Sequence, residues 1–157
     1  MSEVKGSKSM IMTLRVTIER GMYLEEDCMR EIEIETDDTL LGLYFAIQKA
    51  VDFDNDHPFE FFYGRHPRNR KIVIEPESPM IDPLDYYSFH DAIPLSTIWP
   101  VPEKSVQLFY HFDFGDDWYF KIRKISRKDK EPEPKVKYPR VTTKQGPNPK
   151  QYPNLEE

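Results

Sequence analysis

Apolar and polar residues alternate along two stretches near the start of the chain. In residues 11–19 every second position from Met12 onward is apolar, which is the period of a β-strand. Residues 28–35 alternate in the same way, with isoleucines at the positions predicted to face a core. Residues 21–27 suit a turn, so the two stretches predict a β-hairpin. The glutamates predicted to face solvent are Glu31, Glu33 and Glu35.

A helical spacing replaces this alternation in residues 39–51. Apolar residues recur there three and four positions apart, which predicts one amphipathic helix. Asp37 and Asp38 precede it, and their carboxylates are suited to accept hydrogen bonds from the first amides of the helix. Lys49 suits the negative end of the helix dipole. The predicted apolar face consists of Leu40, Leu43, Tyr44, Ile47 and Val51.

Shorter apolar stretches follow the helix. Residues 59–63 and 71–75 are rich in aromatic or β-branched side chains, and we predict a strand for each. Residues 76–94 contain prolines and aspartates without a clear period, so they receive no assignment. Residues 95–99 predict a short helical turn capped by Ser96.

The last hairpin has the clearest alternation in the chain. Apolar residues occupy every second position in residues 105–112 and again in residues 118–122, and residues 113–117 connect them. The order of strand, strand, helix and strands predicts an α+β protein. We expect a small α/β roll, with an antiparallel or mixed sheet and one main helix packed on it. A ubiquitin-like β-grasp is the alternative.

The periodic pattern ends near residue 125. Residues 126–157 hold six of the 14 prolines and carry eight basic against five acidic side chains. We therefore predict one domain over residues 1–125 and a Pro-rich basic tail over residues 126–157, extended or partly disordered. The net charge of the chain is −6, so the predicted domain carries −9, which disfavours bulk affinity for nucleic acid.

Cysteine content and hydropathy exclude some classes of protein. Cys28 is the single cysteine among the 157 residues, so an intramolecular disulfide and a cysteine-rich zinc site are excluded. The longest apolar run is far shorter than the roughly 20 residues of a membrane span. Residues 1–10 contain no signal-peptide apolar block. These observations favour a cytoplasmic protein without a membrane partner, and we expect a monomer or weak dimer.

Residues 111–118 resemble the tyrosine-aspartate-phenylalanine-glycine-aspartate-x-tryptophan signature of the plasmid pRi ORF-three-like family, also labelled as insertion-element passenger, resolvase-type proteins. The resemblance extends from about residue 28 to residue 152. This chain departs from many members by having Phe120 in place of a histidine and Val141 in a region where they often have cysteines. The other segments that resemble the family are residues 39–40, 46–50, 57–61, 95–96 and 138–140.

The resemblance implies an α+β roll and a frequent setting in plasmids and mobile elements. It implies no established biochemical activity. The resolvase label would require a nucleophilic serine among several arginines and a helical DNA-binding segment. The sequence contains neither pattern.

The predicted turn at residues 113–117 is acidic. Asp113, Asp116 and Asp117 could bind Mg²⁺ or Mn²⁺, which prefer oxygen ligands. Asp113 is expected beside His111, because residues two apart share one strand face. The alternative is structural, because aspartate and glycine also dominate hairpin turns. The residues available to move protons beside such a metal are His111, His57 and Glu60.

Further candidate binding residues are aromatic or basic. Trp118 is either a core residue or a ring at the mouth of a cleft, and its alternating strand favours the core. Arg65, Arg68 and Arg70 form a basic loop that could contact phosphates, and Arg140 adds a charge in the tail. The alternative for such a loop is simple exposure to solvent.

No complete active site is visible in the sequence. A nucleophile with its base, a metal-spaced ligand set and a phosphate-binding loop are all missing. We therefore expect a non-catalytic binding or interaction module with a protein partner and without a cofactor. One alternative is a metal-dependent hydrolase or nuclease at the acidic turn. The other is a nucleic-acid-binding accessory protein that uses the basic loop and the tail.

Overall fold

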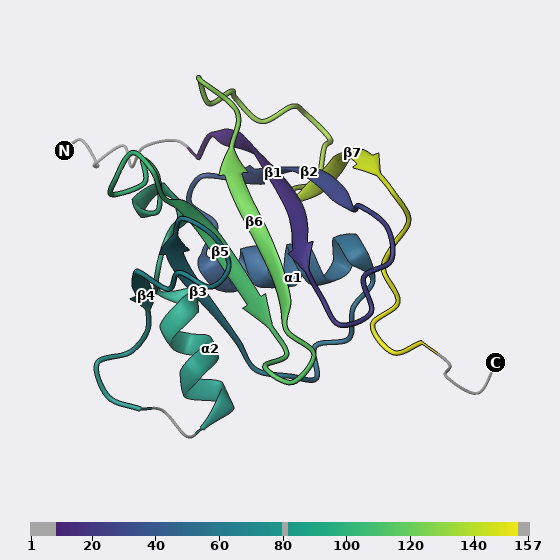
Figure 1. The fold of residues 1–157 in the computed structure, drawn as a ribbon. Coiled ribbons are helices and arrows are strands. Elements are labelled where there is room, and N and C mark those ends of the chain that lie inside the picture. Colours follow the sequence, from purple (N-terminus) through teal and green to yellow (C-terminus); the bar gives the residue numbers. More distant parts are fainter. Residues whose placement is uncertain (1–8, 80–81, 154–157) are drawn as a thin grey trace.

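The computed structural model describes residues 9–79 and 82–153. They form one seven-stranded sheet in the order β4-β3-β5-β6-β1-β2-β7, with every pair antiparallel, and two α-helices (Figure 1). The predicted α+β class and antiparallel sheet are confirmed. The elements are β1 Ile11–Arg20, β2 Met29–Glu35, α1 Leu40–Val51, β3 Phe59–Gly64, β4 Ile72–Ile74, α2 Pro83–Asp91, the 3-10 helix Leu95–Thr97, β5 Gln107–Phe112, β6 Trp118–Lys124 and β7 Arg140–Gln145.

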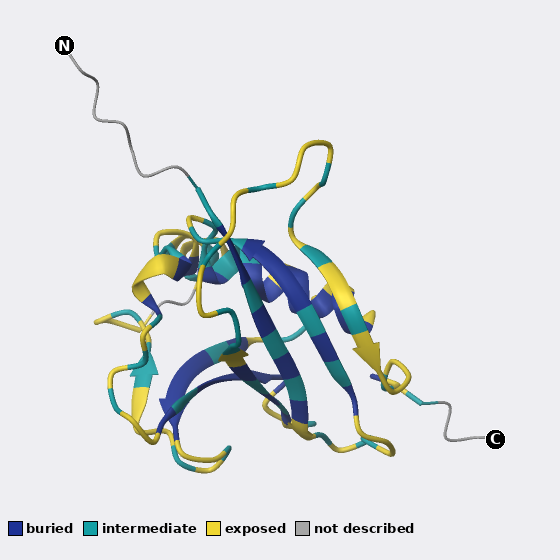
Figure 2. Ribbon diagram, turned by 90° about the horizontal axis from the view of Figure 1, so that it is seen from above, coloured by how far each residue is buried: buried dark blue, intermediate teal, exposed yellow. Residues whose placement is uncertain are grey.

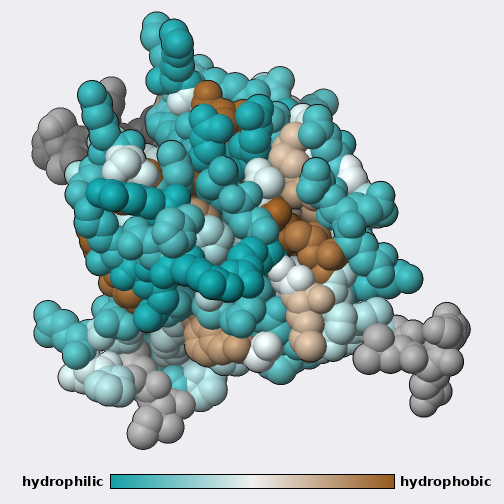
Figure 3. Space-filling model, in the orientation of Figure 1, coloured by the Kyte–Doolittle hydropathy of each residue, from teal (hydrophilic) through white to brown (hydrophobic). Residues whose placement is uncertain are grey.

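The two predicted hairpins lie side by side at the centre of the sheet. β1 pairs with β2, β5 pairs with β6, and β6 also pairs with β1. Helix α1 crosses one face of these strands and connects β2 to β3 (Figure 1). The opposite face is predominantly hydrophilic (Figure 3). In the part of the chain that the structure describes, no helix has the length and apolar character needed to span a bilayer.

The core lies between α1 and the sheet. Buried and partly exposed residues alternate along the central strands, as the two-residue period predicts (Figure 2). Trp118 is fully buried and packs its ring against Phe53, with ring centroids 4.9 Å apart. Gly21 is required beneath it, because a Cβ there would lie 2.1 Å from the indole ring. The core interpretation of Trp118 is confirmed, and its ring is not available to a ligand.

Two predicted helix caps are wrong. Thr39 caps α1 by accepting a hydrogen bond from the amide of Gly42 at 3.1 Å. Asp38 supports the cap instead, since its Oδ1 accepts from the amide of Thr39 at 2.7 Å. Ser96 does not cap the short 3-10 helix, whose N-cap position is Pro94 and has no side-chain hydrogen bond.

Helix α2 lies in the stretch that received no assignment. Asp82 caps it by accepting from the amide of Leu84 at 2.9 Å, and Pro83 occupies the first helical position. Among its described residues only His90 is buried, so the helix has no long apolar face to reveal its period. The proline and the aspartate that suggested an irregular loop therefore begin a helix.

The predicted domain boundary at residue 125 does not match the sheet. β7, which lies beyond it, pairs with β2 from Met29 to Glu33. Glu33, predicted to face solvent, is buried because this C-terminal segment covers it. Its carboxylate binds Lys130 at 2.6 Å and Arg140 at 2.6 Å. Residues 140–145 of the predicted tail are therefore part of the fold.

Buried His90 predicts an acid-sensitive stability. Its Nδ1 lies 2.9 Å from the carbonyl of Tyr86, which can only accept, so Nδ1 carries the hydrogen. Burial lowers the pKa of His90 below its ordinary 6.5. The unfolded chain then binds a proton more readily, so this contribution to stability is complete above about pH 6.5 and decreases below it.

We expect the free energy of unfolding of the wild type to fall from pH 6.5 to pH 5 more steeply than that of His90→Phe. Urea unfolding at several pH values measures both slopes, independently of any constant offset between the two proteins. Glu33 and Glu60, whose pKa values are lowered, act in a separate window below about 4.5. Equal slopes above pH 5 would contradict the role of His90.

Candidate ligand-binding cleft

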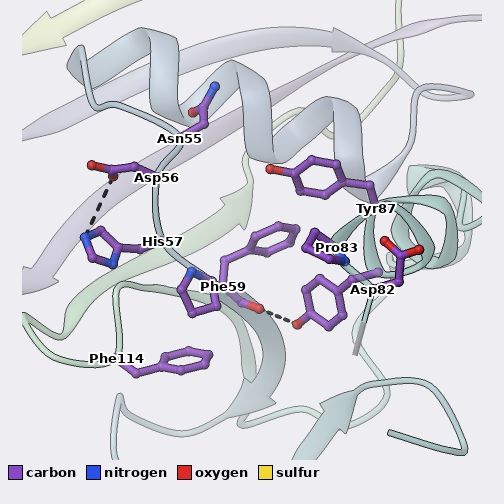
Figure 4. Close-up of a pocket in the computed structure, with 10 residues that line it drawn as sticks. Asn55, Asp56, His57, Phe59, Asp82, Pro83, Tyr87 and Phe114 are labelled. Atoms are coloured by element: carbon purple, nitrogen blue, oxygen red, sulfur yellow. Dashed lines mark hydrogen bonds and ion pairs between the residues drawn. The ribbon is translucent and has the colours of Figure 1, made fainter. Parts of the chain in front are cut away.

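A cleft of about 470 Å³ opens between α2, the segment that enters β3 and the β5–β6 turn (Figure 4). Its walls come from three separate parts of the chain, which the sheet and α2 bring together. Aromatic rings surround the hollow, and polar side chains lie at its two sides. The residues that line it are Asn55, Asp56, His57, Pro58, Phe59, Asp82, Pro83, Tyr86, Tyr87 and Phe114.

The aromatic wall is fixed by packing on the core. The Phe59 ring stacks on Tyr44 of α1 at 4.0 Å and meets Tyr86 edge-on at 5.3 Å. The hydroxyl of Tyr86 donates a hydrogen bond to the carbonyl of Phe59, which ties α2 to β3. Phe114, by contrast, is 48% exposed at the tip of the β5–β6 turn. The cleft therefore combines a rigid floor with one exposed ring at its mouth.

The electrostatic environment of the cleft is negative. Asp56 and Asp82 line it from opposite sides. Burial raises the pKa of Tyr86 to about 12, and the carboxylates of Glu60 and Glu75 add to that effect. Burial disfavours a charge of either sign, whereas the carboxylates disfavour a negative charge in particular. The acidic side chains therefore favour a cation over an anion in the cleft.

The acidic turn forms a compact local structure. Oδ1 of Asp113 accepts hydrogen bonds from the amides of Gly115 and Asp116, both at 3.1 Å. Asp113 and Asp117 have positive φ angles of 62° and 52°, which aspartate tolerates in turns. Burial and the nearby Asp113 carboxylate raise the pKa of Asp116. These contacts are those expected from the structural interpretation of the turn.

The acidic residues of the turn belong to two separate clusters, each with one histidine. His57 Nε2 lies 3.4 Å from Oδ2 of Asp113, at the edge of the cleft. His111 Nε2 lies 2.8 Å from Oδ1 of Asp117, whereas the carboxylate of Asp113, the predicted neighbour of His111, lies beside His57. The other nitrogen of His111 lies 3.5 Å from Glu60. Among the described residues, no group of three or more histidine, cysteine or acidic side chains is arranged to hold a metal ion.

The cluster around His111 lies on the hydrophilic face of the sheet. His111 stacks on Tyr119 with ring centroids 4.1 Å apart, and both guanidinium contacts of Arg70 to Glu60 are 2.8 Å long. Burial alone would raise the pKa of Glu60, but hydrogen bonds from His111 and Arg70 hold it below its ordinary value. This cluster is a cross-strand ion-pair network on β3, β5 and β6.

The predicted basic residues are not gathered at one site. Arg70 forms an ion pair with Glu60. Arg140 binds Glu33 and Glu133 near β7, at the opposite edge of the sheet. Within the described ranges, the side chains of Arg65 and Arg68 form no ion pair. They follow β3, at the end of the sheet opposite the cleft.

The sequence did not reveal how the Asp56 side of the cleft is held. The carbonyl of Asp54 accepts from Nε2 of Gln48 at 3.2 Å, and its amide donates to Oε1 of Gln151 at 2.6 Å. The hydroxyl of Tyr152 donates to Asp56 at 2.9 Å. The contacts of Gln151 and Tyr152 join positions 97 and 96 residues apart, and no local pattern signals them.

Residues 10–151 match the family described as Plasmid pRiA4b ORF-3-like protein. No curated protein matches the chain. The crystal structure of a protein of unknown function from Methanosarcina mazei Go1 is similar, with a TM-score of 0.66 and 24% sequence identity. The similarity covers 90% of this chain and 72% of that protein, and at this identity it shows a shared fold.

Proposed function

This chain belongs to the plasmid pRiA4b ORF-3-like family, and we propose that it is a non-catalytic binding module for a partner protein. The aromatic cleft is the proposed binding site, and its occupant is a lysine or arginine side chain of the partner. The observation that carries the proposal is the combination of aromatic walls with aspartates on opposite sides. A volume of about 470 Å³ lies within the range of ordinary ligand pockets.

Cation–π attraction explains why aromatic rings and acidic side chains belong together in such a site. A cation over a tyrosine or phenylalanine ring gains about 0.5–2 kcal/mol, depending on how far water is excluded. The aliphatic stem of lysine or arginine also packs well against rings such as Phe59 and Phe114. Asp56 and Asp82 then supply the opposite charge, at the sides of the cleft.

Exposed apolar residues around the cleft favour a protein over a small amine. Leu84, beside Pro83 on α2, is 71% exposed. Phe45 of α1 is exposed and lies 6.0 Å from the Tyr87 ring, centroid to centroid. Phe114, which lines the cleft itself, is also exposed. Apolar surface grouped in this way is typical of protein contact sites.

Binding without catalysis is favoured by the residues that line the cleft. His57 and Asp113 resemble a base with its orienting carboxylate. However, the described lining includes no serine, threonine, cysteine or lysine that such a base could activate. The His57 pair is therefore better suited to fix the cleft edge than to move a proton in a reaction.

The test is a titration of the ¹⁵N-labelled protein with two blocked pentapeptides, one with a central arginine and one with citrulline there. The two side chains have nearly the same shape, and only arginine is charged. We expect shifts centred on residues 55–59, 82–87 and 114, with about tenfold weaker binding of citrulline. Phe114→Ala should weaken the binding of the arginine peptide by a similar factor.

Ile72→Ala is the matched control, because Ile72 is exposed on the edge strand β4 and is not among the cleft-lining residues. It should leave the affinity unchanged. Equal binding of the two peptides, or shifts confined to other surfaces, would refute the proposal.

A further inference from the structure

A second cavity lies at the other end of the β5–β6 hairpin, away from the cleft. Its volume is about 420 Å³, and it is formed where the loop before β5 passes the end of β6. Arg123 supplies positive charge and Gln107 supplies an amide, whereas the ammonium of Lys124 is already paired with Asp129 at 3.0 Å. The remaining lining residues are Trp99, Pro100 and Val101. This combination of charge and aromatic surface differs from that of the acidic cleft.

Arg123 faces an unfavourable neighbour in the sheet. It is the direct cross-strand partner of Arg15 on the antiparallel β1–β6 pair. Like charges in this position destabilise a sheet. Arg15 is compensated by Glu31, whose carboxylate accepts from it at 2.9 and 2.7 Å. The exposed guanidinium of Arg123 has no hydrogen bond or ion pair with any residue that the structure describes. An anion would relieve this arrangement.

Trp99 supplies a ring beside this charge. It is partly exposed and packs one side against the core. Over the described ranges it makes no ring–ring contact, unlike Trp118, which packs against Phe53. Indole rings near a guanidinium are typical stacking surfaces for the bases of single-stranded nucleic acids and nucleotides.

The basic loop extends the positive charge beyond the cavity. Gly64, the last residue of β3, pairs with Gln107, so the loop that follows begins beside the cavity. Arg65 and Arg68 are exposed, and within the described ranges their side chains form no ion pair. A ligand with several phosphates in a row would meet these charges after Arg123.

We propose that this cavity binds a nucleotide unit, with its phosphate on Arg123 and its base against Trp99. The unit is either a free mononucleotide or one residue of a single-stranded nucleic acid, since both present the same chemistry. The site is independent of the cleft. Because the whole chain carries a charge of −6, the attraction is local and is screened by salt.

Tryptophan fluorescence tests this site, because Trp118 is fully buried and only Trp99 lines the cavity. The probes are uridine monophosphate, an eight-residue oligothymidylate and inorganic phosphate, each in 20 and 200 mM salt. We expect quenching by both nucleotide probes and a loss of affinity of at least tenfold for the oligonucleotide in the higher salt. An oligonucleotide that binds more tightly identifies a strand as the source, and equal affinities identify a free nucleotide.

Arg123→Gln should lower the affinity for both nucleotide probes about tenfold, a loss within the range for a charge-assisted phosphate contact. Lys128→Gln is the matched control, because Lys128 is exposed and does not line the cavity. Three results would overturn the proposal. They are an absence of quenching by both nucleotide probes, equal binding of inorganic phosphate and uridine monophosphate, or an Arg123→Gln variant that binds like the wild type.

Discussion

Replacing Trp118 with alanine should lower the free energy of unfolding by about 4 kcal/mol, within the range for a large aromatic ring removed from a core. The indole is fully buried and packs edge-on against Phe53. Gly21 packs directly against the ring, since a Cβ at this position would lie 2.1 Å from it. The smaller side chain would leave a cavity that these neighbours fill only in part. Urea unfolding followed by far-UV circular dichroism measures the loss, with an unchanged m-value.

Phe114→Ala provides the matched comparison, because it removes an aromatic ring from the same hairpin at an exposed position. We expect its free energy of unfolding to stay within about 0.5 kcal/mol of the wild type. Below the unfolding transition, Trp118→Ala should bind the arginine peptide with unchanged affinity, whereas Phe114→Ala should not. A stable Trp118→Ala protein with a defective cleft would assign the indole to ligand binding and contradict its place in the core.

The regular elements could be predicted because each has a strong local period. Alternation over residues 105–112 and 118–122 matches β5 and β6, and the three-and-four spacing after Thr39 matches α1. These elements bury one face against a single core, so the hydrophobic pattern and the structure follow from the same requirement. Helix α2 escapes this reasoning because only one of its residues is buried.

The candidate site was predicted only in part, for a related reason. His57 and Phe114 fall in or beside segments that resemble the family or carry candidate chemistry. Tyr86 and Tyr87 lie on α2, in the stretch without a period, so their meeting with Phe59 depends on how the helix docks. Such a meeting is a property of the tertiary structure, and composition alone does not indicate it.

Arg30 shows that the chemical type of a side chain, taken alone, does not indicate its position in β2. It is charged, yet it shares the inward face with Ile32 and Ile34. The C-terminal segment covers it, and its relative exposure is 1%. Its guanidinium donates to the carbonyl of Ala50 at 3.2 Å, near the C-terminal end of α1. It also reaches Gln145, at 3.1 Å.

We expect Arg30→Ala to lower the free energy of unfolding by about 3 kcal/mol, because the buried carbonyl of Ala50 and three partly buried acceptors lose their donor at once. These include the side chain of Asn148, which accepts from Nη2 at 2.8 Å. The loss should loosen the C-terminal segment first, since Arg30 joins it to α1 and β2. Amide hydrogen exchange should therefore accelerate from Gln145 to Gln151 before the central strands are affected.

Arg30→Met separates the hydrogen bonds from the packing of the aliphatic stem. Methionine fills much of the same volume but donates nothing, so we expect a loss of about 2 kcal/mol and the same pattern of exchange. A methionine variant as stable as the wild type would mean that burying the guanidinium costs as much as its hydrogen bonds return.

Because Gln151 holds the backbone of Asp54, both variants should also bind the arginine peptide more weakly, with Asp56 and His57 losing their fixed position. Unchanged peptide affinity in a protein with accelerated exchange would show that the cleft keeps its shape without the C-terminal segment.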